Sequence, residues 1–300
     1  MKKIKLYLLI LFTIILFINK NLIYTSFNYS LSLFLNNVFP SLFIFYIISN
    51  LLINYNFIEF INRFKINKIF NLSENGMFIF IMSILSGFPS SSIYCVDFLN
   101  KKLINKNEAN KLMIYSHFSN PLFIIIMISN ILNKKYAYII LICHYLSNII
   151  LAFLFRNIKI NNNKLYKIKK NDFILCIKES IYKCFKTLLL VFSCIYIFIL
   201  FNELLFKYVY LNDYFKAILS LFLEITGGIG KISNLDISNN IKAILIGMAI
   251  SFGGLSIHLQ IKSIISDTSI SYHQFLISRI LHSSITGILI YISLNTTFLI

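Results

Sequence analysis

The stretch "SGFPSSS", residues 86–92, interrupts an apolar run at a point where a membrane helix would be expected to continue. Gly87 and Pro89 break the helical backbone, and four serines bring hydroxyl groups to the same place. Backbone that leaves the helix inside a bilayer must find other hydrogen-bond partners, so such an interruption has to be enclosed by protein or line a cavity. The stretch therefore predicts an enclosed polar region inside a membrane protein.

The composition of the whole chain agrees with a membrane environment. Of 300 residues, 58% are hydrophobic and 13% are charged, whereas about 25% of the residues of a soluble domain are charged. The net charge of +17 is concentrated in short segments between apolar runs, which is typical of topology signals and not of a nucleic-acid surface. We therefore predict an all-α integral membrane protein whose partner is the lipid bilayer and which binds no nucleic acid.

The first apolar run resembles a secretory signal, because Lys2 and Lys3 precede it. No small-residue cleavage site follows Ile18, so we interpret the run as a retained membrane span. With about 20 residues needed to cross the bilayer, spans are predicted at residues 4–24, 38–57, 110–132, 136–155, 187–206, 241–265 and 270–294.

Two further apolar stretches, 77–100 and 214–233, are interrupted in the middle. If both crossed the bilayer, the basic segments 101–111 and 156–186 would lie outside, against the positive-inside rule. If each is a re-entrant hairpin, most of the 28 Lys and Arg residues lie in the cytoplasm. The sequence thus favours seven spans plus two hairpins, with a cytoplasmic N-terminus.

The only long polar loop divides the chain near its middle. Residues 156–186 form a basic cytoplasmic loop that continues, from residue 173, as an interfacial helix with lysines set among apolar residues. Residues 1–60 hold the N-terminal spans, 61–155 a first repeat and 187–300 a second repeat. No soluble domain is predicted.

Glycine and proline mark four interruptions in matching order. The candidate breaks are Gly87, Pro89, Pro121, Gly227, Gly228, Gly253 and Gly254. Each half of the chain therefore has a broken hairpin followed by a broken span, and the two hairpins enter from opposite sides, which makes an inverted repeat. Broken helices in matching places are the sequence sign of a central binding site.

Hydrogen-bonding side chains lie next to these interruptions. The candidate substrate-binding residues are Ser90, Ser91, Ser92, Ser119, Asn120, Glu224, Thr226, Ser256, His258 and Gln260. Such groups suit a small polar solute better than a metal ion, and neither a metal nor another cofactor is predicted. Serines in membrane helices also bond to their own backbone or join helices, so a structural role is the alternative for each of them.

Glu224 is the strongest candidate, because an ionisable group in an apolar run is costly and usually functional. It is expected to contact a solute, a cation or a proton, and the alternative is an interfacial acid that reaches water. A Glu224→Gln change is expected to remove the charge at little cost in stability. By contrast, Asp97 and Glu108 lie among lysines and are expected in a solvated loop.

An ordered set of motifs makes the chain similar to a known family. The motifs are "SGFPSSS", "NKNEANKL" at 105–112, "FSNPLFII", "LEITGGI", "SFGGLSIHLQ" and "SYHQFLISRILH". Together they resemble the sporulation integral membrane proteins of the YlbJ family, which carry the nucleoside-recognition or Gate domain pattern. The two predicted repeats, 61–155 and 187–300, are Gate-like in this comparison.

The resemblance implies a multi-pass protein of the cell membrane or forespore membrane that is needed for spore cortex formation. It implies no enzymatic activity, and the sequence has no H-E-x-x-H or G-x-S-x-G motif. The Gate pattern is also similar to parts of concentrative nucleoside transporters and ferrous-iron uptake proteins, which favours a permease for a small polar solute. Ser119 replaces the groups that nucleoside transporters have before the proline, so the carry-over to Ser119 and Asn120 concerns position only.

The alternative is a membrane scaffold or assembly factor in spore envelope formation, working with other sporulation membrane proteins. A scaffold has no need of four breaks lined by polar groups, whereas a permease does. The sequence does not specify the solute or the oligomeric state.

The hairpin topology predicts the result of cysteine labelling. A cysteine introduced at Lys102 or Lys167 should be protected from an impermeant thiol reagent applied outside, and a cysteine at Asn212 should react. Labelling at Lys102 from outside would instead favour a plain series of crossing spans.

Overall fold

The structure is a computed structural model that describes residues 2–55, 57–160 and 172–296, and these residues form helices and turns without a strand. This confirms the predicted all-α fold. The helices are α1 (Lys2–Ile18), α2 (Lys20–Leu33), η1 (Phe34–Val38), α3 (Phe39–Asn54), α4 (Phe57–Asn62), η2 (Ile66–Lys68), α5 (Glu74–Ser86), α6 (Ser90–Asn100), α7 (Lys106–Tyr115), α8 (Pro121–Ile131), α9 (Lys134–Leu154), α10 (Phe173–Tyr208), α11 (Asp213–Leu223), α12 (Ile225–Ser233), α13 (Asn239–Phe252), α14 (Gly254–Ile265) and α15 (Tyr272–Asn295).

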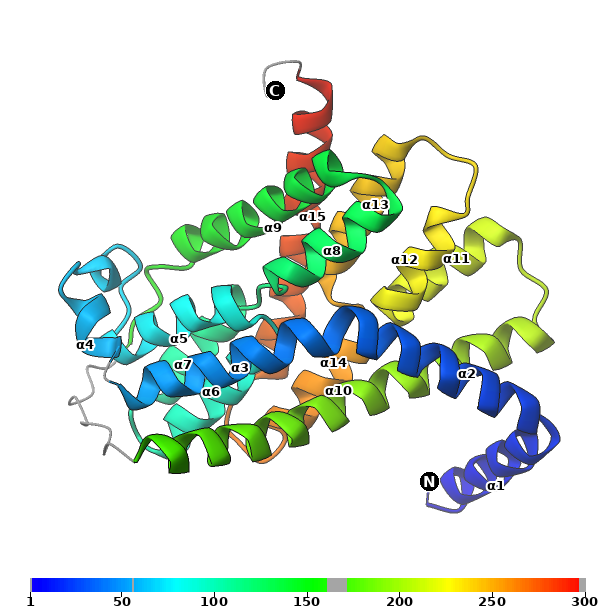
Figure 1. Ribbon diagram of the computed structural model, residues 1–300, viewed down its shortest axis with the longest axis horizontal. Helices are drawn as coiled ribbons and strands as arrows, with labels where there is room; N and C mark the ends of the chain where they lie inside the picture. The colour runs from blue at the N-terminus through cyan, green and yellow to red at the C-terminus, as the bar shows by residue number, and fades with distance from the viewer. Residues whose placement is uncertain (1, 56, 161–171, 297–300) are drawn as a thin grey trace.

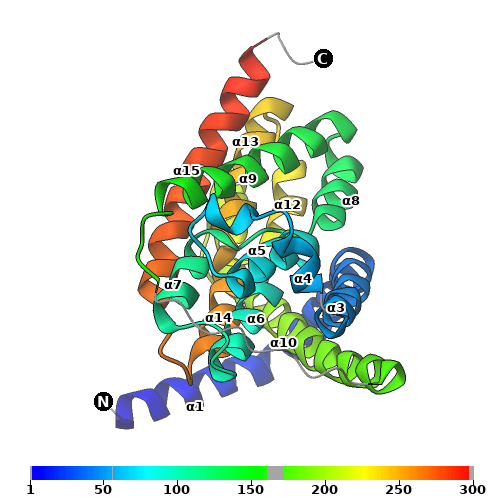
Figure 2. The same ribbon diagram turned by 90° about the vertical axis from the view of Figure 1, so that its left-hand side faces the viewer.

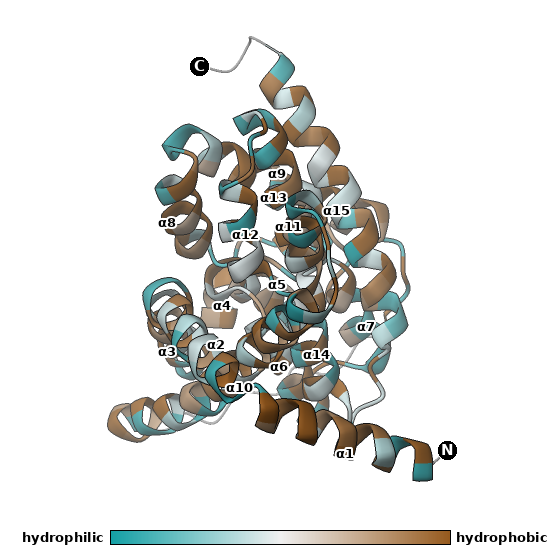
Figure 3. Ribbon diagram, turned by 90° about the vertical axis from the view of Figure 1, so that its right-hand side faces the viewer, coloured by the Kyte–Doolittle hydropathy of each residue, from teal (hydrophilic) through white to brown (hydrophobic). Residues whose placement is uncertain are grey.

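Five helical stretches are long and apolar enough to cross a membrane, judged by length and composition. They are Lys20–Asn54, Lys134–Leu154, Phe173–Tyr208, Asn239–Ile265 and Tyr272–Asn295. The 17-residue α1, apolar along most of its length in Figure 3, and the broken pair α7 and α8 correspond to the other two predicted spans. The length and composition of these helices are those of a multi-pass membrane protein. Much of the predicted basic loop, residues 161–171, lies outside the described residues.

The ends of the first two predicted spans need correction. The structure turns at Asn19, whose side chain donates to Ile15 O at 2.6 Å, and then continues as one helical stretch through α2, a π-helical turn and α3. Residues 25–37, between the two predicted spans, are helical in the structure, and several of their polar side chains bond back to the preceding turn, as Ser30 Oγ does to Ser26 O at 2.7 Å.

The predicted interfacial helix is not a separate element. Residues 173–186 are the first half of α10, a single helix of 36 residues. No glycine or proline occurs in this segment to end the helix. α10 runs beside α2 and α3 along the long axis of the molecule (Figure 1).

The two halves of the chain repeat the same order of elements. In the first half the hairpin α5–α6 is followed by the broken helix α7–α8 and by α9. In the second half the hairpin α11–α12 is followed by the broken helix α13–α14 and by α15. The hairpins enter from opposite ends of the molecule in Figure 1, which is the arrangement of the predicted inverted repeat. In Figure 2, α5 and α6 lie between α15 on one side and α3 and α10 on the other.

The break in the second hairpin lies earlier than predicted. The chain leaves the helix at Glu224, with φ −147° and ψ 119°, and the predicted breaks Gly227 and Gly228 lie inside α12. Gly228 serves close packing instead, because a Cβ there would lie 2.4 Å from the Cα of Leu221. The other predicted breaks coincide with helix ends: Gly87 and Pro89 join α5 to α6, Pro121 begins α8, and Gly253 and Gly254 join α13 to α14.

Glu108 was expected in a solvated loop, but the structure buries it together with Lys111. The Glu108 carboxylate accepts from Ser73 N at 2.7 Å, and the Lys111 ammonium donates to the carbonyl oxygens of Asn71 and Arg156 at 2.9 and 2.6 Å. These charged groups therefore join α7 to the residues just before and at the start of α5 and to the first residues after α9. Asp97 does lie at the surface, in an ion pair with Lys101.

The packing at Gly228 predicts opposite effects for two neighbouring glycine substitutions. Gly228→Ala should lower the free energy of unfolding by about 2 kcal/mol, because the methyl group would overlap the α11 backbone. Gly230→Ala should be neutral or stabilising by up to about 1 kcal/mol, because the nearest atom to its Cβ, the Tyr29 hydroxyl, is 3.4 Å away.

The comparison can be made by thermal unfolding with a thiol-reactive dye, since all five cysteines are buried and react on unfolding. Equal melting temperatures for the two variants would contradict this account of the hairpin.

Candidate solute site between the two halves

The first hairpin turn and the break between α7 and α8 are packed against each other. Gly87 has φ +71°, and a Cβ at this position would lie 2.5 Å from the backbone nitrogen of Asn120. Phe88 N donates to Phe118 O at 2.8 Å, so the two interruptions share a backbone hydrogen bond. Only glycine combines this backbone angle with so close an approach.

The Asn120 side chain connects the parts of this junction through both its amide oxygen and its amide nitrogen. Its Oδ1 accepts from Leu122 N at 2.9 Å and so caps α8, where Pro121 occupies the first turn. Its Nδ2 lies 3.2 Å from Leu85 O and 3.4 Å from Ser41 O. One side chain thus connects the broken helix, the hairpin and α3.

Glu224 lies at the turn of the second hairpin, where it caps the next helix as Asn120 does at the break between α7 and α8. It is 2% exposed, and it caps α12 with both carboxylate oxygens. Oε1 accepts from Thr226 N at 3.0 Å, and Oε2 accepts from Gly227 N at 2.7 Å and from the Thr226 hydroxyl at 2.6 Å. The N-terminus of a helix stabilises a negative group, which explains how an acid is accommodated here.

This geometry corrects the expectation that Glu224→Gln costs little stability. The amide oxygen of glutamine would accept from one of the two backbone N–H groups, but its NH₂ group would face the other, which would then have no acceptor. The free energy of unfolding is expected to fall by about 1–3 kcal/mol, so the substitution lowers stability as well as removing the charge.

The second broken helix packs onto the second hairpin through glycine. Gly253 and Gly254 have φ +100° and +56°, which favours glycine at both positions. A Cβ on Gly254 would lie 3.2 Å from the side chain of Ile225 and 3.5 Å from Leu221 O. In each half, therefore, the turn of the hairpin rests on the break of the following helix.

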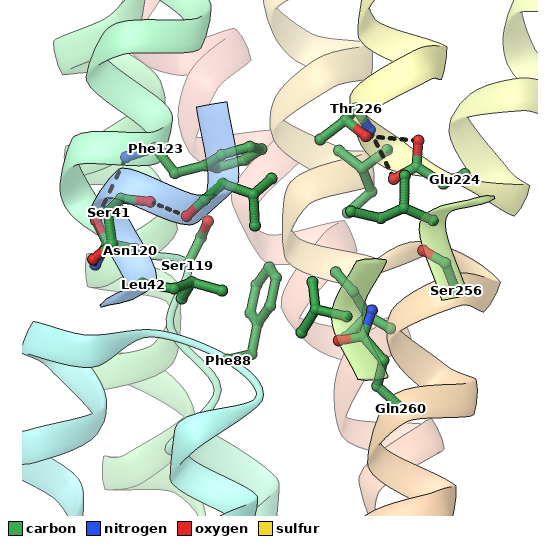
Figure 4. A pocket seen from close by; sticks show the side chains of 15 residues that line it. Ser41, Leu42, Phe88, Ser119, Asn120, Phe123, Glu224, Thr226, Ser256 and Gln260 are labelled. Carbon is green, nitrogen blue, oxygen red and sulfur yellow. Dashed lines mark hydrogen bonds between the residues drawn. The ribbon is translucent and has the colours of Figure 1, made fainter. Parts of the chain in front are cut away.

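A cavity lies where these junctions face each other (Figure 4). Its polar lining consists of Ser41, Ser119, Asn120, Glu224, Thr226, Ser256 and Gln260. Its apolar lining includes Phe88, Phe123, Ile225 and Ile257. The volume of the cavity, measured for the centres of water-sized molecules, is about 50 Å³. This is roughly enough for three or four waters or one small solute.

Six of the ten candidate residues meet in this cavity. They are Ser119, Asn120, Glu224, Thr226, Ser256 and Gln260. The Ser119 hydroxyl lies at the cavity, is buried and has no hydrogen-bond partner among the described residues. A buried hydroxyl without a partner is unfavourable, so this group is available to a bound molecule.

The other four candidates lie elsewhere. Ser91 and Ser92 point to His117, with Ser92 Oγ 2.9 Å from His117 Nε2, and Ser90 is buried at the start of α6. His258 Nε2 lies 3.1 Å from Phe252 O, the end of α13, and its Nδ1 lies 2.9 Å from the Tyr272 hydroxyl. These residues support the hairpin and the second break instead of lining the cavity.

Ser41 and Phe88 line the cavity but were not among the candidates. Ser41 follows Pro40 at the start of α3, so a proline was again the available signal. Phe88 carries no polar group, and nothing in the sequence separates it from the other phenylalanines.

The break between α7 and α8 is supported by buried side chains of α9 and α15. Tyr145 and Asn148 donate to the carbonyls of Ser119 and His117 at 3.0 Å each. The Arg279 guanidinium donates to Ile114 O at 2.6 Å and to His117 O at 3.2 Å. A cation at the C-terminal end of α7 complements the helix dipole.

A chain of hydrogen bonds links the two broken helices. Ser119 N donates to His144 Nε2 at 2.9 Å, so in the neutral ring the proton lies on Nδ1, which donates to Ser251 Oγ at 2.8 Å. Ser251 then donates to Thr286, and Thr286 to Ser147, both at 2.9 Å. His144 therefore connects the cavity-lining break of the first half to the end of α13 in the second.

Among the described residues, no group of three or more His, Cys, Asp or Glu side chains is placed to hold a metal ion. The cavity therefore offers neutral hydrogen-bonding groups and one capped carboxylate.

Comparison with known proteins identifies a relative. The chain is 27% identical over 296 residues to "Sporulation integral membrane protein YlbJ" of Bacillus subtilis (strain 168), and the similarity spans 84% of this chain and 72% of that protein. No protein-family model matches the chain, and no solved structure matches it. The resemblance to this family is thereby confirmed, whereas the Gate domain pattern stays a prediction.

The hydrogen-bond chain predicts energetic coupling between Ser251 and Thr286. Ser251→Ala and Thr286→Val should each lower the free energy of unfolding. The double variant should lose less than the sum of the two single losses, by on the order of 1 kcal/mol, because both substitutions remove the same hydrogen bond. Melting temperatures of the four proteins give the coupling. Ser251→Ala combined with Ser284→Ala, an exposed serine of the same helix as Thr286, should be additive. If the stability losses of Ser251→Ala and Thr286→Val were additive, the hydrogen bond between these two residues would be excluded.

Proposed function

The chain is a homologue of the YlbJ-family sporulation integral membrane proteins, and we propose that it is a permease for a small polar solute used in spore cortex formation. The solute would bind in the cavity between the two halves. The observation that supports this proposal is the convergence of Ser119, Asn120, Glu224 and Gln260 from both halves on one cavity. The membrane would be the cell membrane or the forespore membrane.

The arrangement of the helices around the cavity bears on the chemistry of the solute. α6, α8, α12 and α14 all begin beside it, because cavity-lining residues occur in or next to the first turn of each. Asn120 and Glu224 cap two of these helices, whereas α6 and α14 have no side-chain cap. Half-helix N-termini favour negatively charged or hydrogen-bond-accepting groups. A solute that presents a neutral hydrogen-bond acceptor fits this site best, because the Glu224 carboxylate lines the same cavity.

The size of the cavity also restricts the solute. The cavity volume of about 50 Å³, measured for the centres of water-sized molecules, leaves no room for a nucleoside in this conformation. The lining is formed by side chains of both repeats, so movement of one repeat against the other would open the site to one side at a time.

Removal of the unpartnered hydroxyl tests this function most cleanly. Ser119→Ala should leave membrane abundance and melting temperature unchanged or slightly raised, because no protein hydrogen bond is lost. It should weaken solute binding by about two- to tenfold, and Ser119→Ala with Gln260→Leu by about tenfold or more. The readout is complementation, the yield of heat-resistant spores in a spore former that lacks its own copy.

Ser116→Ala is the matched control. The Ser116 hydroxyl is also buried without a partner in the same break, but it does not line the cavity. Abundance should be checked by immunoblot for every variant. Full spore resistance in the Ser119/Gln260 double variant would contradict the permease and favour a scaffold in envelope formation.

A further inference from the structure

A second, larger cavity lies between α3, α6, α10 and α14. Its volume, measured for the centres of water-sized molecules, is about 560 Å³. Its lining includes Tyr46, Asp97, Lys183, Lys186, Thr187 and Ser263. We refer to it as the vestibule.

The vestibule continues the path of the central cavity. Three helices line both spaces with residues one turn apart: Leu42 and Tyr46 on α3, Val191 and Thr187 on α10, and Gln260 and Ser263 on α14. One turn of helix rises about 5.4 Å, so the two spaces are neighbours along the same helix faces. The vestibule lies toward the end of α10 that the basic segments place in the cytoplasm.

The charge of the vestibule is positive. Lys183 and Lys186 bring two ammonium groups from α10, and within the described part of the chain neither has a carboxylate partner at ion-pair distance. The one acid in the lining, Asp97, is already paired with Lys101 at 2.7 Å. The Tyr46 hydroxyl belongs to the same lining and is suited to an oxygen-rich ligand, whereas the Thr187 hydroxyl donates to Lys183 O at 3.0 Å.

We propose that the vestibule is a binding site for an anionic group, a carboxylate or a phosphate, held by Lys183 and Lys186. The proposal rests on the proposed function, because the vestibule is then the inner mouth of the path to the central cavity. A cation does not fit, since the only carboxylate is neutralised by Lys101. The same anionic chemistry is present in a soluble anion and in an anionic lipid headgroup, and basic pockets between membrane helices on the cytoplasmic side bind anionic lipid headgroups.

The test uses the purified full chain and two probes. Inorganic phosphate is titrated against chloride at equal ionic strength in a neutral detergent, and nanodiscs of phosphatidylglycerol are compared with nanodiscs of phosphatidylcholine. Binding is measured as a rise in melting temperature with the thiol-reactive dye. Lys183→Gln with Lys186→Gln should weaken the effective probe by about tenfold or more. Lys135→Gln with Lys178→Gln removes the same charge from exposed positions outside the vestibule and should leave the shift unchanged.

The outcomes separate the sources and the two proposals. A lysine-dependent shift with phosphate alone assigns the site to soluble anions, and one with phosphatidylglycerol alone assigns it to a lipid headgroup. Ser119→Ala alters only the central cavity and should keep either shift. The vestibule site is excluded if neither probe raises the melting temperature. It is also excluded if the Lys183/Lys186 double variant and the Lys135/Lys178 double variant show equal shifts in melting temperature. That result leaves the central cavity, tested separately by the Ser119 variants, unaffected.

Discussion

The carbonyl groups left open at the end of α7 are the constraint on which the rest of the structure depends. In a membrane these groups have no water to bond, so protein must supply every partner. Arg279 from α15 and Tyr145 and Asn148 from α9 supply them. The break can exist only because α9 and α15 pack together behind it, and this fixes where the last helix of each repeat must lie.

The same constraint is met differently in the second half. At the end of α13, His258 reaches the carbonyl of Phe252, and glycine backbone allows the hairpin to cover the remainder. Asn120 caps α8 after the break in the first half, and Glu224 caps α12 at the hairpin turn in the second. Both caps also line the cavity, so side chains that satisfy the backbone form part of its polar lining. The cavity is a consequence of how the backbone is satisfied.

The sequence predicted the elements that depend on local chemistry. Gly87 and Gly253 follow helix ends and Pro121 and Gly254 begin helices, because a proline ring or a positive φ acts on its own segment. The position of the second hairpin turn was missed, since Gly227 and Gly228 can lie within a helix when a neighbouring backbone is close. Six candidate residues met at the cavity, whereas Ser90, Ser91 and Ser92 turned away, because the rotation of α6 depends on His117 from a distant segment. The burial of Glu108 and Lys111 likewise depends on carbonyls and amides that are far away in the chain.

The most direct measurement is a cryo-electron microscopy map of the full chain in nanodiscs, purified from sporulating cells without exchange of small molecules. The account predicts non-protein density in the cavity between Asn120 and Glu224, within hydrogen-bond distance of the Ser119 hydroxyl. A map in which the two hairpins have closed over this space, with the Ser119 hydroxyl bonded to a protein group and no density between the halves, would contradict it.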